Sequence, residues 1–494
     1  MLLENLALGL DTMLTATNLT WCLLGVTIGT LVGVIPGLGS MIAMSMFLPL
    51  SYHMDLIPAL ITMAGIYYGS QYGGSITATL LNMPGHPASA VTCLDAYPMT
   101  QQGRGGVALA TAAVASFMGG ILAVIVMVIL GSYMTHIVFM FGPAEYFSVM
   151  LLGLVAVSIL ERTNLLANIS MVMLGILFGL IGTDIHTGQP RLTFGIEQLG
   201  SGIHIIPMIM GLFGLGEMLC RISDYDIRSR STHAGRWIPT RLETVRAVKS
   251  GLRGSAIGSV FGALPGTGCT IASFASYMWE KMTSRHAHEF GRGAIEGVAG
   301  PEAANNAASQ TAFVPTLTLG VPGDPMMILI MALLLIQGIS PGPTLMIDHA
   351  NIFWTLVVCF VIGNVMLLIL NLPLIKMWTS IVNIPYVVLY PTIVFVMCTG
   401  VYAVNNNIFD IVSLVFFGLF GLMMRQLGIN ATPFVLGFVL GAPMEDNLRR
   451  ALLLASYSDE FVFTRPIVAV TIGLIIMLVM IRAIFTRKKV YAQH

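Results

Sequence analysis

Polar side chains that could bind a small ion gather in a few short stretches of an otherwise apolar chain. Residues 300–311 read GPEAANNAASQT, and in a helix Glu302, Asn306 and Ser309 would share one face, with Asn305 directly before Asn306. Amide, hydroxyl and backbone oxygens suit a hard cation such as Na⁺, whereas Glu302, Asp324 or His86 could instead carry a proton. The pattern therefore indicates an ion-binding face, and it slightly favours sodium.

A second polar stretch, residues 67–77, reads YYGSQYGGSIT within a long apolar run. Hydroxyls, an amide and small residues are costly to expose to lipid, so this face must contact protein, water or a ligand. Small residues also serve as packing contacts between membrane helices, and for any single residue here the two interpretations carry about equal weight.

Both stretches lie next to a pattern that occurs twice. Residues 29–39 read GTLVGVIPGLG and residues 258–268 read GSVFGALPGTG, so four glycines and one proline recur 229 positions later (258 minus 29). A Pro-Gly pair also follows the polar stretch of each half, at residues 84–85 and 322–323. The chain therefore contains an internal duplication with two elements in each half.

Each Pro-Gly pair predicts a break in a helix, because proline removes an amide donor and glycine permits unusual backbone angles. At membrane depth, nonhelical backbone is tolerated only where protein buries it or where it lines a polar cavity. The breaks near residues 36 and 84, and those near 265 and 322, therefore predict a binding site between the two halves. The alternative is that these kinks serve packing alone.

The composition is that of a polytopic membrane protein. Of 494 residues, 56% are hydrophobic and 9% are charged, against roughly 25% charged residues in a soluble domain. Uncharged runs such as residues 107–130 and 352–372 are long enough to cross a hydrocarbon core of about 30 Å. No basic tract is dense enough to suggest nucleic acid, and the six scattered cysteines indicate neither disulfides nor a metal site.

Charged residues divide the chain into a first membrane half (1–220), a basic loop (221–253) and a longer second half with extra C-terminal helices (254–494). By the positive-inside rule the loop and the basic C-terminus are cytoplasmic and the N-terminus lies outside. An odd number of crossings before the loop would give the two copies opposite orientations. We therefore expect an all-α polytopic membrane protein whose two inverted repeats, with broken or re-entrant helices, meet near the membrane midplane among scaffold helices.

A smaller local prediction concerns residues 442–450. The acidic pair Glu445 and Asp446 suits the start of a helix, and both residues can pair four positions on with Arg449 and Arg450.

Other functional classes lack their signature residues. An intramembrane metalloprotease needs His-Glu-x-x-His, and the string at 288–292, HEFGR, lacks the second histidine. The spacing at 320–324, GVPGD, does not match an intramembrane aspartyl protease, and neither a Walker loop nor a dinucleotide fingerprint occurs. A channel fits two inverted halves less well than alternating access does. We therefore expect a transporter without a cofactor rather than an enzyme.

Six motifs together resemble the large membrane subunit of the tripartite tricarboxylate transporters over nearly the whole chain. They are GVIPGLG at 33–39, YGSQYGGS at 68–75, DAYPM at 95–99, GALPG at 262–266, PEAANNA at 301–307 and GVPG at 320–323. Ala96 departs from the glycine expected at its position, which falls in a presumed loop.

The resemblance implies a multi-pass importer of carboxylates in the bacterial inner membrane, driven by Na⁺ or protons, with no metal site beyond a Na⁺ at the same residues. It also implies two partners, a small membrane subunit and a periplasmic solute-binding protein. A solitary transporter of another small polar solute is the alternative. The substrate and ion site that the resemblance implies comprises Pro36, Gly37, Ser70, Gly73, Gly74, Ser75, Thr77, Pro265, Gly266, Glu302, Asn305, Asn306, Pro322 and Gly323.

Overall fold

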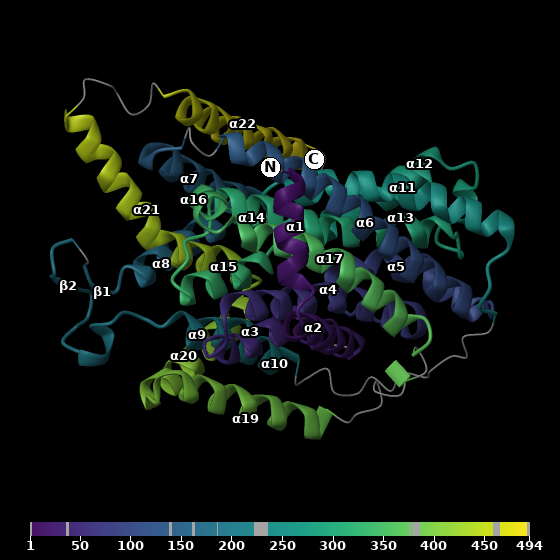
Figure 1. Ribbon diagram of the computed structural model, residues 1–494, viewed down its shortest axis with the longest axis horizontal. Helices are drawn as coiled ribbons and strands as arrows, with labels where there is room; N and C mark the ends of the chain where they lie inside the picture. Colours follow the sequence, from purple (N-terminus) through teal and green to yellow (C-terminus); the bar gives the residue numbers. More distant parts are fainter. Residues whose placement is uncertain are drawn as a thin grey trace.

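The structure is a computed structural model that describes residues 2–35, 39–137, 141–160, 164–184, 186–221, 236–374, 377–378, 386–457 and 465–491. These ranges are helical apart from short connections and one β-hairpin (Figure 1). The elements before residue 222 are α1 (Leu2–Met13), α2 (Ala16–Val34), α3 (Gly39–Ser51), α4 (Leu56–Leu81), α5 (Ala90–Gln101), α6 (Gly105–Ile137), α7 (Pro143–Leu160), α8 (Leu165–Gly179), β1 (Gly182–Thr183), β2 (Pro190–Arg191), α9 (Ile205–Ile209), a π-helical turn (Met210–Leu215) and α10 (Gly216–Arg221).

The elements after residue 235 are helices as well. They are α11 (Arg241–Ala263), α12 (Gly268–Thr283), α13 (Glu296–Thr311), α14 (Phe313–Leu319), α15 (Met327–Ile336), α16 (Pro343–Asp348), α17 (Ala350–Asn371), α19 (Tyr386–Asn405), α20 (Ile408–Gln426), α21 (Thr432–Tyr457) and α22 (Pro466–Tyr491). Short 3₁₀ turns at Pro87–Ser89, Glu197–Leu199 and Ala287–Glu289 complete the described part.

Four described helices, α2, α6, α17 and α20, are long and apolar enough to cross a membrane. Several shorter apolar helices, among them α3, α8 and α15, accompany them. The prediction of a helical, multi-pass membrane protein is thus confirmed. Helix α6 packs against α4 from one half and against α13 and α17 from the other, so both halves share one interior (Figure 1).

Helices end at the predicted break positions in both halves of the duplication. Helix α11 ends at Ala263 and α12 begins at Gly268, while α2 ends at Val34 and α3 begins at Gly39. Residues 36–38, which include Pro36 and Gly37, lie outside the described residues. The second elements end alike, because the residue that follows α4, Asn82, and the residue that follows α14, Gly320, both adopt left-handed backbone angles, with φ of 57° and 69°.

The duplicated helices also pack in the same register. A Cβ on any of three glycines of α2 would come within 3.0 Å of a carbonyl oxygen of α4, and three glycines of α11 stand in the same way against α13. The pairs are Gly25 with Thr62, Gly29 with Ile66, Gly33 with Ser70, Gly254 with Gly300, Gly258 with Ala304 and Gly262 with Ala308. Every contact of the first set recurs in the second after an offset of 229 residues in one helix and 238 in the other (304 minus 66). The opposite orientation of the two copies stays a prediction.

Gly258→Ala tests this close packing. The added methyl group would collide with the Ala304 carbonyl oxygen, and such overpacking typically costs about 1–3 kcal/mol. We expect a lower midpoint of thermal unfolding in detergent, measured by intrinsic fluorescence. Gly251→Ala on the same helix is the control, because its Cβ would meet only the Met118 side chain, at 3.5 Å. Equal effects of the two substitutions would contradict the packing argument.

Two local predictions differ from the structure. Helix α11 begins at Arg241, where Thr240 and Glu243 form a reciprocal capping box, so residues 241–253 are helical rather than part of the basic loop. Helix α21 runs without a break from Thr432 and carries Pro443 in its interior, so residues 442–450 do not start a helix. The two ion pairs predicted within residues 442–450 are present, since Arg449 lies 2.6 Å from Glu445 and Arg450 lies 2.9 Å from Asp446.

The segment DAYPM is also helical rather than a loop, and its first residue joins the two halves. Asp95 lies in α5 with its side chain buried. Its Oδ1 atom accepts backbone N–H groups of residues 291, 293 and 294 at 2.8–2.9 Å, and its Oδ2 atom accepts the Tyr277 hydroxyl at 3.0 Å. Ala96, the next residue of α5, is fully buried in a cluster of apolar side chains, so it belongs to a packed helix and not to a turn.

Candidate functional site

The two helix breaks of the second half meet each other. The Gly266 N–H donates to the Pro322 carbonyl and the Gly268 N–H donates to the Gly323 carbonyl, each at 3.2 Å. Gly266 and Gly268 both have positive φ, 78° and 65°, which lets the chain turn sharply between α11 and α12. The structure thus brings Pro265, Gly266, Pro322 and Gly323 into one junction within the second half. The binding site between the two halves stays a prediction.

Asp324 holds this junction together. Its Oδ2 atom accepts the Cys269 N–H at 3.2 Å, in the first turn of α12, and its Oδ1 atom accepts the Met326 N–H at 2.9 Å, directly before α15. A carboxylate suits these positions, because the first N–H groups of a helix have no partner within the helix and carry partial positive charge. The junction therefore already binds one carboxylate group, that of the protein itself.

A small cavity lies at the junction. Its volume is about 20 Å³, and its lining includes Gly266, Pro322, Asp324 and, from outside the duplicated elements, Thr432. A space of this size holds about one water molecule. No di- or tricarboxylate fits in this conformation, so a larger solute could bind here only after the surrounding helices move.

The second break of the first half has a related arrangement. Gly85 lies against the Gly74 backbone and the Gly33 carbonyl, just as Gly323, 238 residues later, lies against the backbone of Ala312. His86 stands where Asp324 stands in the other half, and its Nδ1 atom accepts the Ser89 N–H at 3.3 Å. The first-half junction thus ends in a buried imidazole instead of a carboxylate.

Glu302 lies in a buried pocket made by helices of both halves. The Thr92 hydroxyl of α5 donates to Oε1 at 2.5 Å. The Ser75 hydroxyl of α4 and the Ser116 hydroxyl of α6 donate to Oε2 at 2.6 and 3.3 Å. Asn306, one turn along α13, donates from Nδ2 to the Ser116 Oγ at 2.7 Å. The structure therefore brings together Ser75, Glu302 and Asn306, three of the residues in the predicted site.

Several buried amides beside this pocket have atoms without a hydrogen-bond partner among the described residues. They are Oδ1 of Asn306, both side-chain amide atoms of Asn305 and Gln310, and Oε1 of Gln71. All four side chains are at least 97% buried. Because an unpaired buried amide group costs about 1–3 kcal/mol, so many in one core mark a polar interior suited to a ligand or ion.

The remaining candidates serve contacts within the first half. The Ser70 hydroxyl donates to the Tyr67 carbonyl at 2.6 Å, and the Thr77 hydroxyl donates to the Gly74 carbonyl at 3.0 Å, both within α4. Gly73 packs against the backbone of α2, and Gly74 lies beside the His86 ring. The structure does not bring these four to Glu302, whereas it does bring Ser75.

Sequence reasoning missed Thr92 and Ser116 as partners of Glu302. Each is a lone hydroxyl within a helix, a pattern that usually reflects packing or an internal hydrogen bond. Their approach to Glu302 depends on how α5 and α6 pack against α13, which no local pattern reveals. Asp324 carried a signal, since it replaces His86 in the repeated Pro-Gly-x-Pro motif.

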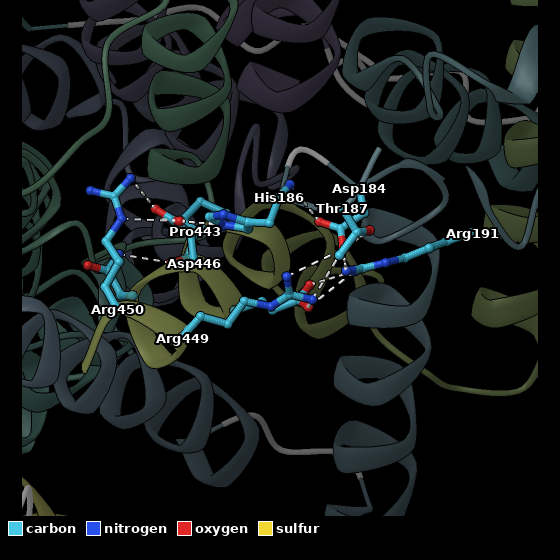
Figure 2. A network of polar contacts seen from close by, with 10 residues as sticks. Asp184, His186, Thr187, Arg191, Pro443, Asp446, Arg449 and Arg450 are labelled. Carbon is cyan, nitrogen blue, oxygen red and sulfur yellow. Dashed lines mark hydrogen bonds and ion pairs between the residues drawn. The ribbon is translucent and has the colours of Figure 1, made fainter. Parts of the chain in front are cut away.

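A separate polar network ties the β-hairpin to α21 at the end of the molecule opposite α12 (Figures 1 and 2). Asp184 pairs with Arg191 and, at 3.3 Å, with Arg449, while His186 Nε2 lies 2.9 Å from Asp446. The His186 backbone N–H, the Thr187 hydroxyl and the Arg191 guanidinium lower the pKa of Asp184 well below its ordinary value. These ion pairs and hydrogen bonds attach the β-hairpin to α21, so we interpret them as structural contacts rather than as a binding site.

Asp184→Asn tests whether these ion pairs hold the β-hairpin against α21. A carboxylate whose pKa is lowered by folding contributes stability above its unfolded-state pKa of about 4 and loses that contribution as the pH falls through the folded value. At neutral pH we therefore expect faster amide hydrogen exchange over residues 182–191 in the variant. Glu197→Gln, on the exposed turn of the same loop, is the control. Unchanged exchange in Asp184→Asn would show that the ion pairs do not hold the hairpin.

A larger groove of about 480 Å³ lies elsewhere, at the starts of α2, α4 and α17. Its lining includes Asn18, Asp55 and His349. None of the predicted site residues that the structure describes lines this groove, whereas Gly266 and Pro322 line the junction cavity, so the junction of helix breaks remains the stronger candidate for a carboxylate.

Sequence comparison with known proteins gives matches over most of the chain. The sequence model of the Tripartite tricarboxylate transporter TctA family matches residues 19–436. An uncharacterized 52.8 kDa protein from the TAR-I ttuC' 3' region of Agrobacterium vitis is 44% identical over 470 residues, which cover 95% of this chain and 93% of that protein. An uncharacterized protein from the TAR-II ttuC' 3' region of the same organism is 49% identical over 218 residues, covering 44% of this chain and 90% of that protein.

No solved structure shows a significant match. The family match spans more than 400 residues and includes all four helix breaks, both polar stretches and the Glu302 pocket. The chain therefore belongs to the tripartite tricarboxylate transporter family, as its large membrane subunit.

Proposed function

We propose that this chain is the transport subunit of a secondary active importer that carries carboxylates across the bacterial inner membrane, driven by a cation gradient. Family membership supports transport by a tripartite system. The observation that carries the substrate class is the junction of helix breaks, where the N–H groups of Cys269 and Met326 bind the Asp324 carboxylate. Helix N-termini and free amides recognise carboxylates without any Lys or Arg.

The small size of the junction cavity supports alternating access. A cavity of about 20 Å³ excludes the substrate in this conformation, so binding and release each require movement of the broken helices against the remaining helices. The duplicated pairs α2–α4 and α11–α13 are closely packed through glycines, so each pair moves as a unit. We propose that the two pairs are inverted repeats, with the N-terminus periplasmic and the C-terminus cytoplasmic.

Two partners complete the proposal: a small membrane subunit and a periplasmic solute-binding protein that delivers the carboxylate. The test is uptake of radiolabelled di- and tricarboxylates into proteoliposomes containing this chain and its small membrane partner, with and without the binding protein and an inward sodium gradient. Uptake that needs the binding protein supports the tripartite mechanism. Uptake that ignores it would favour a solitary transporter, and transport of none of the carboxylates would overturn the proposed substrate class.

A further inference from the structure

Glu302 differs from every other buried carboxylate in the described part of the chain. Each of the others accepts a hydrogen bond from at least one N–H group or forms an ion pair: Asp95 with backbone N–H groups, Glu145 with Arg465, Asp184 with Arg191, Glu217 with Arg425, Glu280 with Arg253, Glu296 with Arg246, Asp324 with backbone N–H groups and Asp410 with His204. Among these buried carboxylates, Glu302 alone accepts hydrogen bonds only from hydroxyl groups.

This difference matters for what the pocket can bind. An N–H group offers a hydrogen and no lone pair, so it repels a cation. A hydroxyl can donate to the carboxylate when the pocket is empty and can turn its lone pair to a cation when one enters. Every group that donates directly to the Glu302 carboxylate can therefore become a cation ligand.

The charge balance points the same way. Glu302 is fully buried, and no Lys, Arg or His among the described residues forms an ion pair with it. An uncompensated carboxylate in a dry core is costly, because buried charges are paired or coordinate metals. A bound monovalent cation would neutralise this carboxylate.

The neighbouring amide supplies an independent indication. Asn306 is fully buried one turn from Glu302, and its Nδ2 atom donates to the Ser116 Oγ, which in turn donates to Glu302. Its Oδ1 atom has no hydrogen-bond partner among the described residues. Two carboxylate oxygens and three hydroxyl oxygens meet directly at Glu302. The Asn306 amide oxygen adds a further oxygen donor one helical turn away, and oxygen donors are the ligands that hard cations prefer.

We infer that Glu302, Ser75, Thr92, Ser116 and Asn306 form a sodium site, separate from the carboxylate-binding junction at residues 265–268 and 322–324. The inference rests on the proposed function in that this ion would be the coupling cation. Helix α13 carries the ligands Glu302 and Asn306 and leads through α14 to the break that Asp324 holds. Occupancy of the sodium site would thereby bias the position of the break.

The experiment is equilibrium binding of radioactive sodium to the purified complex in detergent, with choline chloride keeping the ionic strength constant, at pH 6 and pH 8. We expect saturable binding by the wild type, loss of that binding in Glu302→Gln, and retention in Glu145→Gln, whose carboxylate pairs with Arg465 outside the pocket. Sodium binding that survives Glu302→Gln would overturn the assignment.

A second pair of variants keeps the test decisive if Glu302→Gln does not fold. Thr92→Val removes one hydroxyl ligand with little change of shape and should weaken sodium binding about tenfold, the effect of roughly 1.4 kcal/mol. Thr100→Val on the same helix is the control, because its hydroxyl donates to the Thr79 carbonyl, away from the pocket. Equal sodium affinity of these two variants would contradict the site.

The outcomes separate the two proposals. Carboxylate uptake that responds to pH but not to sodium, together with no sodium binding by the wild type, would leave the proposed function standing and overturn the sodium site in favour of a proton on Glu302. Sodium binding that is lost in Glu302→Gln, in a complex that transports no carboxylate, would support the ion site and contradict the proposed function.

Discussion

Replacing Asp324 with alanine is expected to abolish carboxylate uptake. The substitution removes the hydrogen bond that joins the start of α12 to Asp324 and the hydrogen bond that closes the turn before α15. Hydrogen bonds to charged groups contribute about 1.5–3 kcal/mol each. The loss of about 3 kcal/mol or more would lower the population of the assembled junction by roughly a hundredfold. Initial uptake rates in proteoliposomes measure the effect, normalised to folded protein by size-exclusion chromatography.

Asp55→Ala is the matched control for Asp324→Ala. Asp55 occupies the N-cap position of α4, but its side chain makes no capping hydrogen bond, so removing it should leave transport near the wild-type rate. Asp324→Asn retains one acceptor oxygen and should keep part of the activity. Wild-type uptake by Asp324→Ala would show that the meeting of the two breaks is not needed for transport.

Replacing Asn306 with alanine is expected to abolish uptake as well, for a different reason. The Asn306 amide bridges the Ser116 hydroxyl and the Glu302 backbone carbonyl, at 2.7 and 3.1 Å, and its buried Oδ1 atom has no hydrogen-bond partner among the described residues. In Asn306→Ala, the Ser116 hydroxyl oxygen loses the N–H group that donates to it and orders it. We expect uptake to fall to background while the protein remains folded in the membrane.

Asn371→Ala on α17 separates a functional role of Asn306 from the general cost of removing a buried asparagine. Asn371 is also buried and also donates from Nδ2 to the carbonyl four residues earlier. Its Oδ1 atom likewise has no hydrogen-bond partner within the described ranges. The sodium and carboxylate sites do not include it. If both variants transport equally, the site lies elsewhere on the chain.

The helix breaks could be predicted from sequence because they depend on local chemistry. Proline and glycine end a helix wherever they fall, and the duplication identified which pairs correspond. The structure extends that prediction by showing that glycines one turn apart on α2 and α11 meet the same register positions of their partners. Close helix packing follows from the GxxxG-like spacing, which membrane helices use where backbones approach.

The partners of Glu302 could not be predicted, because they come from three helices distant in sequence. Ser75 lies in the polar stretch of the first half, but Thr92 and Ser116 are isolated hydroxyls whose direction depends on tertiary packing. The prediction of a loop at residues 95–99 is wrong for a similar reason. Asp95 and Pro98 resemble turn residues locally, yet the carboxylate of Asp95 accepts N–H groups from residues nearly 200 positions away, and this tertiary contact overrides local preference.

The most direct test of the central claim is a cryo-EM map of this chain with its small membrane partner and a transported carboxylate. We expect density for the carboxylate between the breaks, next to Gly266 and the Pro322–Asp324 turn, in a cavity expanded well beyond its present volume of about 20 Å³. Carboxylate density confined to the groove lined by Asn18, Asp55 and His349, with the junction unchanged, would contradict the claim that the duplicated helix breaks form the transport site.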